Sequence, residues 1–305
     1  MCLRGDVSDV FKTLQARTCP VASIHPTAVV DPRAEIAADV SIGPFSVVES
    51  GVVIGEGCRV AGHTVIKAGT CLGKNNSVSE GVVLGGRPQH LRAGDRVGRL
   101  RIGDGNSIRE HVTIHSGLGT DDWTEMGDQN LIMVNAHIAH DCHVGNHTVL
   151  TNNVMIAGHV SIGDRAYVSG AVGIHQFCRI GQLAMVGGQA HLNRDVPPFV
   201  TIDGLSSHVV GLNTIGLRRN GYREPDIQQL KAAYRVIYRS GLSWNEVLQT
   251  LQQEFPTGPA AAFHEFLSQA RRGIMQERHG PGRAPLRLFT DPETSEAAAA
   301  VRHVI

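Results

Sequence analysis

An aliphatic residue returns at every sixth position between residues 24 and 186, with two interruptions. A period of six fits neither the 3.6 residues of an amphipathic helix nor the alternation of a two-sided sheet, and it is the signature of a hexapeptide parallel β-helix. The period therefore predicts a mainly β fold in which these side chains fill a triangular prism. The members of this phase are Ile24, Val30, Ile36, Ile42, Val48, Ile54, Val60, Ile66, Leu72, Val78, Leu84, Ile102, Ile108, Ile114, Met126, Ile132, Ile138, Val144, Leu150, Ile156, Ile162, Val168, Ile174, Ile180 and Val186.

Two other positions of the repeat are restricted in side-chain size. Glycine follows the aliphatic residue at many corners, where we expect it to supply a positive φ. These glycines are Gly43, Gly55, Gly73, Gly85, Gly103, Gly127, Gly145, Gly163, Gly181 and Gly187. Small side chains stand two positions before the aliphatic residue, because a triangular interior leaves little volume there. They are Ala28, Ala34, Ser46, Cys58, Thr64, Ala136, Cys142, Thr148, Ala166, Cys178 and Ala184.

Composition excludes several classes of protein. Lys+Arg and Asp+Glu both number 28, so no basic excess indicates binding to nucleic acid or to an acidic membrane. Six cysteines lack CxxC pairing, and Cys58, Cys142 and Cys178 fall in the small-residue position, as is typical of core thiols in a reducing compartment. No apolar run reaches the ~18 residues of a membrane span, and residues 1–20 lack a signal-peptide core. We therefore expect a cytoplasmic protein without a membrane span.

The pattern divides the chain into four parts. Residues 1–20 are an N-terminal extension with a short helix at 7–15, and residues 21–198 are the prism. A first excursion (residues 86–100) and a second excursion (residues 116–125) leave the period, and such loops tend to carry binding residues. Pro197 and Pro198 should stop further ladder pairing. Residues 199–275 are a connector and a small helical domain, and residues 276–305 should form a poorly ordered tail.

The helical domain shows three apolar stripes at helical spacing. They comprise Ile227, Leu230, Ala233, Tyr234 and Ile237; then Val247, Leu248, Leu251 and Phe255; then Phe263, Phe266, Leu267 and Ala270. The prism also carries apolar residues at positions that we assign to its outer faces. They are Val82, Val83, Met133, Val134, Val154, Met155, Val172 and Val200. These residues predict that the faces pack around a three-fold axis, with sites between subunits.

Histidines gather in the middle of the prism, where residues 111–175 hold eight of the sixteen. Three hexads close one coil, so Asp141 should lie over His159 and Ala157 over His175, with His140 beside Asp141. The three imidazoles would then converge on one edge, and a carboxylate beside a histidine supports a general base. A metal site is the alternative, because such histidines could ligate zinc or iron. The γ-class carbonic anhydrases use the solenoid in that way, but a trimeric metal-binding protein of their type would give the helical domain and the first excursion no role.

Several segments closely resemble the UDP-N-acetylglucosamine O-acyltransferases that open lipid A synthesis. They are residues 135–142 (NAHIAHDC), 152–153, 157–160, 175–177, 186–188 and 195–198, with residues 233–241 in the helical domain. The resemblance covers about residues 24–273 and implies a left-handed parallel β-helix followed by a small α-helical C-terminal domain. It also implies a homotrimer that needs no metal or cofactor. Its reaction would move a 3-hydroxyacyl chain from acyl carrier protein to the 3-hydroxyl of UDP-N-acetylglucosamine.

The resemblance also implies residue roles. His140 would be the general base, Asp141 would orient it, and the Gly158 N–H would stabilise the thioester oxyanion. Sugar and nucleotide contacts are implied for Gln89, His90, Arg92, His137, His159, His175, Gln176, Asn213 and Arg219. Acyl-chain contacts are implied for Met185 and Gly188, where a larger side chain at 188 would shorten the groove. Basic residues of the helical domain would meet the acidic carrier, namely Arg218, Arg235, Arg239, Arg271 and Arg272.

Some positions depart from the family pattern. His90 stands where the family usually has an acidic residue, Arg92 replaces a lysine, and Ile215 and Asn220 replace an acid and an arginine of the connector. The base and the oxyanion donor are unaffected, but a 3-amino sugar nucleotide becomes an alternative acceptor. The sibling N-acyltransferases carry a folded uridine-binding domain before the coil, and the N-terminal extension is too short to form one. An acetyl-CoA-dependent acetyltransferase of the same solenoid is a further alternative.

Overall fold

The fold is seen in a computed structural model that describes residues 22–91, 93–95 and 97–278. The N-terminal extension with its predicted helix, Arg92 and the tail from residue 279 onward lie outside these ranges. None of the helices in the described part of the chain has the length and apolar character that crossing a membrane requires.

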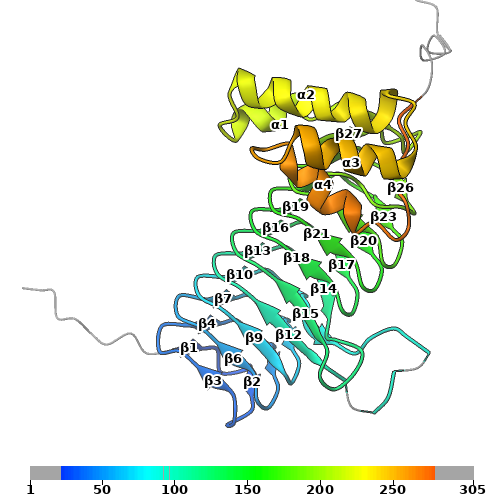
Figure 1. The fold of residues 1–305 in the computed structure, drawn as a ribbon. Coiled ribbons are helices and arrows are strands. Elements are labelled where there is room, and N and C mark those ends of the chain that lie inside the picture. The colour runs from blue at the N-terminus through cyan, green and yellow to red at the C-terminus, as the bar shows by residue number, and fades with distance from the viewer. Residues whose placement is uncertain (1–21, 92, 96, 279–305) are drawn as a thin grey trace, which may run out of the picture.

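Three parallel sheets form the walls of a triangular prism (Figure 1). The first, sheet A, contains β1 (Ser23–Ile24), β4 (Ser41–Ile42), β7 (Arg59–Val60), β10 (Ser77–Val78), β13 (Ser107–Ile108), β16 (Leu131–Ile132), β19 (Val149–Leu150), β22 (Tyr167–Val168), β25 (Met185–Val186), β27 (Val200–Ile202) and β28 (Val209–Leu212). Sheet B contains β2 (Val29–Val30), β5 (Val47–Val48), β8 (Val65–Ile66), β11 (Val83–Gly86), β14 (Thr113–His115), β17 (His137–Ile138), β20 (Met155–Ile156), β23 (Gly173–Ile174) and β26 (His191–Leu192). Sheet C contains β3 (Glu35–Ile36), β6 (Val53–Ile54), β9 (Thr70–Leu72), β12 (Arg99–Ile102), β15 (Trp123–Met126), β18 (His143–Val144), β21 (Ser161–Ile162) and β24 (Arg179–Ile180).

The predicted hexapeptide β-helix is confirmed by this topology. Strands pair with those three hexads away, so that Ile138 opposes Ile156 and Ile156 opposes Ile174. All periodic aliphatic residues from Ile42 to Val186 are at most 5% exposed, and they form one continuous core. Ile24, in the first described strand, is 42% exposed. Burial of these branched side chains is the main force that holds the coils together.

The glycines after the aliphatic residues do not have the predicted conformation. Except at Gly85, their φ is not positive, and the left-handed position lies three residues after the aliphatic one instead, as at Asn153 and His159. The glycines are needed for space. A Cβ at Gly127, for example, would lie 2.3 Å from Oδ1 of Asn146 on the next coil.

Four of the residues assigned to the outer faces point inward. Val82, Val154, Val172 and Val200 are completely buried. Each stands two positions before an inward aliphatic residue, and residues two apart in a strand share a face. Val83, Met133 and Val134 are half-buried, and Met155 is 55% exposed. The three-fold assembly stays a prediction.

The prism continues beyond the two prolines. Strand β27 pairs in parallel with β25, so the expectation that Pro197 and Pro198 end the ladder is wrong. Pro198 lies in the turn before β27, against Gly181 of the previous coil, and so removes no strand hydrogen bond. Strand β28 then returns antiparallel to β27.

The four helices found in the described ranges cover the C-terminal end of the prism (Figure 1). They are α1 (Thr214–Arg219), α2 (Glu224–Arg239), α3 (Trp244–Glu254) and α4 (Ala261–Ser268). The last three are the predicted helices, and their buried faces pack against Leu183 and Phe199 of the final coils. Helix α1 was not predicted. The residue that marks its start in the sequence is the N-cap Asn213, whose Oδ1 accepts a hydrogen bond from the Gly216 N–H.

Polar contacts fasten the helical domain to the prism and the residues after it to α2. Asp195 is 1% exposed, and its carboxylate accepts from Nε of Arg179 at 3.0 Å, while Arg179 also donates to the Phe266 carbonyl of α4. Residues 276–278 fall within the predicted tail but are placed against α2. There, the Glu277 carboxylate accepts from the Tyr234 hydroxyl at 2.8 Å and from Arg239 at 2.6 Å. The division into domains stays a prediction.

Candidate active site

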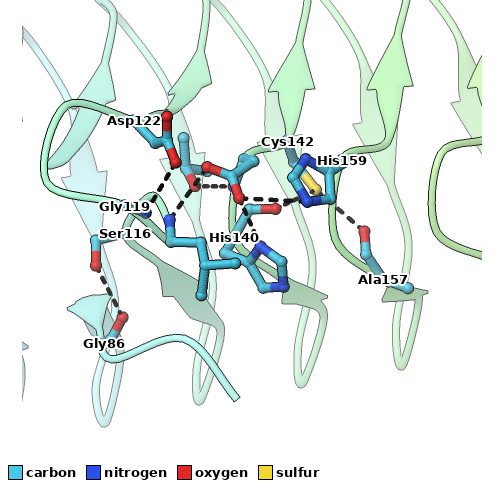
Figure 2. Close-up of polar contacts among 11 residues, drawn as sticks. Gly86, Ser116, Gly119, Asp122, His140, Cys142, Ala157 and His159 are labelled. Carbon is cyan, nitrogen blue, oxygen red and sulfur yellow. Dashed lines mark hydrogen bonds and ion pairs between the residues drawn. The ribbon is translucent and has the colours of Figure 1, made fainter. Parts of the chain in front are cut away.

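The histidines meet at one edge of the prism. We call residues 139–141, 157–159 and 175–177, which follow β17, β20 and β23, the histidine corner. His140 and His159 lie on neighbouring coils with their rings 5.1 Å apart and perpendicular (Figure 2). His140 is only 6% exposed. The ring of His90, from the first excursion, packs edge-on against the His140 ring, with the two ring centroids 5.4 Å apart.

His140 is bonded to the carboxylate beside it. Its Nδ1 lies 2.6 Å from Oδ2 of Asp141. A carboxylate oxygen accepts hydrogen bonds, so we assign the hydrogen to Nδ1 and the lone pair to Nε2. This tautomer leaves Nε2 able to take a proton from a substrate.

The second excursion holds Asp141 in place. The Leu118 N–H donates to Oδ1 of Asp141 at 3.1 Å, and the Asp141 N–H donates to Oγ1 of Thr124 at 2.8 Å. Asp141 itself has a φ of 59°, which aspartate tolerates better than most residues. Sequence reasoning missed Leu118 and Thr124, because both lie where the hexapeptide count is interrupted.

Gly158 supports the other side of the base. A Cβ at this position would lie 2.5 Å from Cε1 of His140, so only glycine lets the imidazole settle against the main chain. Among the described residues, the Gly158 N–H has no hydrogen-bond partner. A free donor beside the base is what stabilisation of an oxyanion requires.

His159 follows the predicted stacking. Its Nε2 lies 3.6 Å from Oδ2 of Asp141, as the step of one coil predicted. The ring of Phe177, one coil further on, stacks on His159 at 4.6 Å and 8°. Burial lowers the pKa of His159, and the Asp141 charge opposes that shift. The same step of one coil from His159 could have identified Phe177.

His137 lies beside this corner on the outer face of β17. Its Nδ1 is 2.7 Å from Oγ1 of Thr113, and its ring meets that of His115 at 4.7 Å and 78°. Burial and the nearby His140 lower the pKa of His137. Burial, followed by His137 and His140, lowers the pKa of His115 to about 4.

The other residues with predicted roles fall into separate groups. His175 and Gln176 are exposed at the histidine corner, and Gln89 is exposed in the first excursion. Arg92 lies outside the described residues. Met185 and Gly188 lie on sheet A and at the corner after it. Asn213 lies at the third corner, where it donates to the Leu183 carbonyl, and Arg219 is the last residue of α1. One chain therefore spreads these residues over all three corners.

A groove of about 880 Å³ joins the histidine corner to the helical domain. His159 and Phe177 line one end, and Arg271 and Arg272, just after α4, line the other. Arg239, also assigned to carrier binding, is instead paired with Glu277, and Arg218 lies 3.5 Å from Glu224. Arg235 is exposed on α2.

The donor set of His140, Asp141 and His159 invites comparison with a metal site, since their ligand atoms lie within 4.8 Å of one another. Two ligands of a tetrahedral zinc ion stand about 3.3 Å apart when each bond is about 2.0–2.1 Å. The 2.6 Å between Nδ1 and Oδ2 is shorter and is a hydrogen-bond distance. This geometry is that of a carboxylate-bound base.

A thiol behind the corner can also be assessed as a nucleophile. Cys142 is completely buried and its Sγ lies 3.2 Å from the Ala157 carbonyl (Figure 2). Burial raises the pKa of the Cys142 thiol to about 12, so the reactive thiolate is suppressed. Cys142 is therefore not poised to act as a nucleophile.

Comparison with known proteins identifies relatives of this chain. A family model of bacterial transferase hexapeptide repeats matches residues 33–68 and 124–158, and one described as UDP N-acetylglucosamine O-acyltransferase, domain 2, matches residues 195–275. The chain is 46% identical over 259 residues to the acyl-[acyl-carrier-protein]–UDP-N-acetylglucosamine O-acyltransferase of Burkholderia orbicola, which covers 83% of this chain and 99% of that relative.

Solved structures give the same picture. The chain is similar to LpxA of Acinetobacter baumannii, with a TM-score of 0.80 and 41% identity over 83% of this chain and 99% of the other. It is also similar to the UDP-N-acetylglucosamine acyltransferase of Francisella novicida, with a TM-score of 0.81 and 36% identity over 84% of this chain and 95% of the other.

Proposed function

The chain belongs to the family of the acyl-[acyl-carrier-protein]–UDP-N-acetylglucosamine O-acyltransferases, and from this membership we propose how it transfers an acyl chain from acyl carrier protein to UDP-N-acetylglucosamine. The donor is a 3-hydroxyacyl thioester, the acceptor is the 3-hydroxyl of the sugar, and His140 is the general base. The sequence resemblance implies that this reaction opens lipid A synthesis, and we place it in the cytoplasm.

One observation carries the proposal: Nδ1 of His140 donates to Asp141, Nε2 has no hydrogen-bond partner in the part of the chain that the structure describes, and the ring lies against the Gly158 main chain. A base and an oxyanion donor must both lie near the reacting carbonyl. The contact between the ring and Gly158 supports that arrangement.

The reaction then follows in balanced steps. Nε2 of His140 takes the proton of the acceptor hydroxyl as its oxygen attacks the thioester carbonyl carbon. The carbonyl oxygen becomes an oxyanion, which the Gly158 N–H stabilises. The oxyanion collapses with cleavage of the C–S bond, and the imidazolium returns its proton to the departing thiolate. The products are the sugar ester and the free carrier thiol, and Asp141 supports the imidazolium throughout.

The active enzyme is a homotrimer in this proposal. His140, Gly188 and Asn213 lie at three different corners of one prism, so one chain cannot gather them at a single substrate. A neighbouring chain can supply what is missing, because its own corners face the first chain. The 55% exposed Met155 and the half-buried Val83 and Met133 offer apolar surface for such packing.

Acyl carrier protein is the proposed donor partner. Arg271 and Arg272 stand at the far end of the groove that begins at His159. Two cations at that place suit the acidic surface of the carrier and the phosphate of its prosthetic arm. Arg239 is less suited, because Glu277 already neutralises it.

The test is an acyl-transfer assay with the purified chain. UDP-N-acetylglucosamine and its 3-amino analogue are offered separately with a panel of 3-hydroxyacyl carrier proteins, and the products are identified by mass. We expect transfer to the 3-hydroxyl. Exclusive use of the 3-amino sugar would reject the 3-hydroxyl as the acceptor. It would then point to His90, which contacts His140, as a residue that changes the acceptor specificity. Absence of any acylated product would reject the function.

Acyl length should depend on residue 188. Gly188 is exposed in the single chain, and a Cβ there would lie 3.3 Å from the Gly170 carbonyl oxygen, so a long side chain can only extend outward. Gly188→Met should therefore shift preference toward shorter acyl chains, measured as the ratio of kcat/KM values across the carrier panel. An unchanged ratio would place the end of the acyl groove elsewhere.

A further inference from the structure

His115 occupies the place where both excursions leave the prism. It ends β14, and it pairs with Gly86 of β11 at a register shift between Leu84 and Gly86. The first excursion begins at Gly86, and the second begins directly after His115. A Cβ at Gly86 would lie 2.9 Å from Cδ2 of His115, so the imidazole rests on the main chain of the earlier coil.

The two excursions are hydrogen-bonded to each other near His115. Figure 2 shows Ser116 bonded to Gly86, and the Ser116 N–H donates to that carbonyl at 3.0 Å. Further along, the Gly98 N–H donates to the Gly117 carbonyl at 2.8 Å, and the Gly117 N–H donates to the Arg99 carbonyl at 3.1 Å. The segment between His115 and Leu118 is therefore held between the first excursion and the prism.

The ring of His115 is held by packing. It is 7% exposed and makes its edge contact with His137 on the next coil. Within the described residues its Nδ1 has no hydrogen-bond partner. Its lowered pKa agrees with a neutral ring at neutral pH. A buried side chain that makes no hydrogen bond through Nδ1 acts here mainly through its shape.

We propose that His115 is a positioning residue for the acyl transfer: its ring, packed between Gly86 and His137, fixes the start of the second excursion. Three residues later, the Leu118 N–H donates to Asp141, and Asp141 orients His140. The inference rests on the proposed function for its kinetic consequences, but its structural part concerns the Asp141–His140 hydrogen bond alone.

The kinetic test compares two substitutions of His115. His115→Ala should lower kcat about 10- to 100-fold, because a small displacement of the base costs that much, and KM for the nucleotide sugar should stay unchanged. His115→Phe retains a planar ring without nitrogen atoms and should keep kcat within about threefold of wild type, as a shape-conserving change. Equal loss in both variants, or a raised KM with normal kcat, would show that His115 contacts the substrate and would overturn the proposal.

A second pair of variants tests the contact with Gly86. Gly86→Ala should lower kcat by a similar factor, because its new methyl group pushes the ring from its place. The same change should have little further effect in His115→Ala, where the ring is gone. Full additivity of the two effects would contradict the shared mechanism. Val48→Ala, which opens a cavity in a distant coil of the same core, controls for general loosening and should keep kcat.

A third measurement does not depend on turnover. The short hydrogen bond between His140 and Asp141 should give a downfield proton resonance in wild type. We expect this resonance to broaden or shift in His115→Ala and to persist in His115→Phe and Val48→Ala. If wild type shows no acyl transfer, the proposed function fails while this resonance still decides the role of His115. A resonance identical in wild type and His115→Ala would reject the positioning role.

Discussion

At the corner that follows the strands of sheet C, the second residue after the inward aliphatic is an Asp or Asn in four successive coils, and each of these residues caps the coil before it. Oδ1 of Asp104, Asp128, Asn146 and Asp164 accepts in turn from the N–H of Lys74, Asp104, Asp128 and Asn146, at 2.7–2.8 Å. We call these four acceptor residues the Asx ladder. The same turn position at the histidine corner is occupied by His140 and Gly158, and among the described residues the Gly158 N–H has no hydrogen-bond partner.

The difference shows how one repeated fold separates stability from chemistry. The Asx ladder satisfies the turn N–H of Lys74, Asp104, Asp128 and Asn146 within the fold, and the glycine before each of these donors makes room for the oxygen atom. At the histidine corner the ladder of side chains is interrupted, and the free N–H and the imidazole lie together instead. We therefore expect substitutions at the two corners to change different measured quantities.

The largest expected effect is loss of the base. His140→Ala should lower turnover by about 10²–10⁴, the usual contribution of a general base, while the protein stays folded. The matched control is His147→Ala, an exposed histidine directly after Asn146, which should retain turnover. A His140→Ala enzyme as fast as wild type would move the base elsewhere.

The pH dependence of stability should come from the histidine side of the prism. The folded pKa of His115 is about 4 and that of the unfolded residue about 6.5. Between these values the unfolded chain binds more protons, so the stabilising effect of the neutral ring is complete above pH 6.5 and is lost as the pH falls toward 4. The loss amounts to roughly 3 kcal/mol for this residue.

Urea unfolding at pH 7.5 and pH 5, at constant protein concentration, measures this effect. His115→Phe should show a smaller fall in unfolding free energy than wild type, with His137 accounting for part of what remains. Equal pH dependence in the two proteins would show that His115 is not the responsible group.

The same small change at the two corners should separate activity from stability. Gly158→Ala should lower kcat by about one to two orders of magnitude, because the new Cβ displaces the His140 ring. Gly145→Ala would place its Cβ 2.3 Å from Oδ1 of Asp164 and should lower the melting temperature while kcat is retained. Loss of kcat in both variants to the same degree would remove the distinction between the corners.

The smallest expected effect belongs to a single member of the Asx ladder. Asn146→Ala removes the acceptor for the Asp128 N–H and should lower the free energy of unfolding by about 1 kcal/mol. Turnover should be unchanged. Denaturant unfolding and steady-state kinetics on the same sample check both statements, and lost turnover at unchanged stability would couple the ladder to the site.

Much of the site follows from counting along the chain. The step of one coil placed Asp141 against His159, and the same step leads on to Phe177. The count does not reach Leu118 or Thr124, because the second excursion lengthens the chain between paired strands, so that Thr113 pairs with His137. The six-residue count also does not show that Val154 points inward. That follows only from the alternation of side chains along a strand, which puts Val154 on the same face as Ile156.

The amino-acid sequence by itself determined the prism, its register and the edge at which His140, Asp141 and His159 meet. It could do so because every coil repeats the same short-range pattern, and ladder hydrogen bonds permit only one register once the aliphatic residues are buried. Only the tertiary structure decided how Asp141 is oriented and what anchors the excursions. Those contacts join Leu118 to Asp141 and His115 to Gly86, and they depend on loop conformations that follow no period.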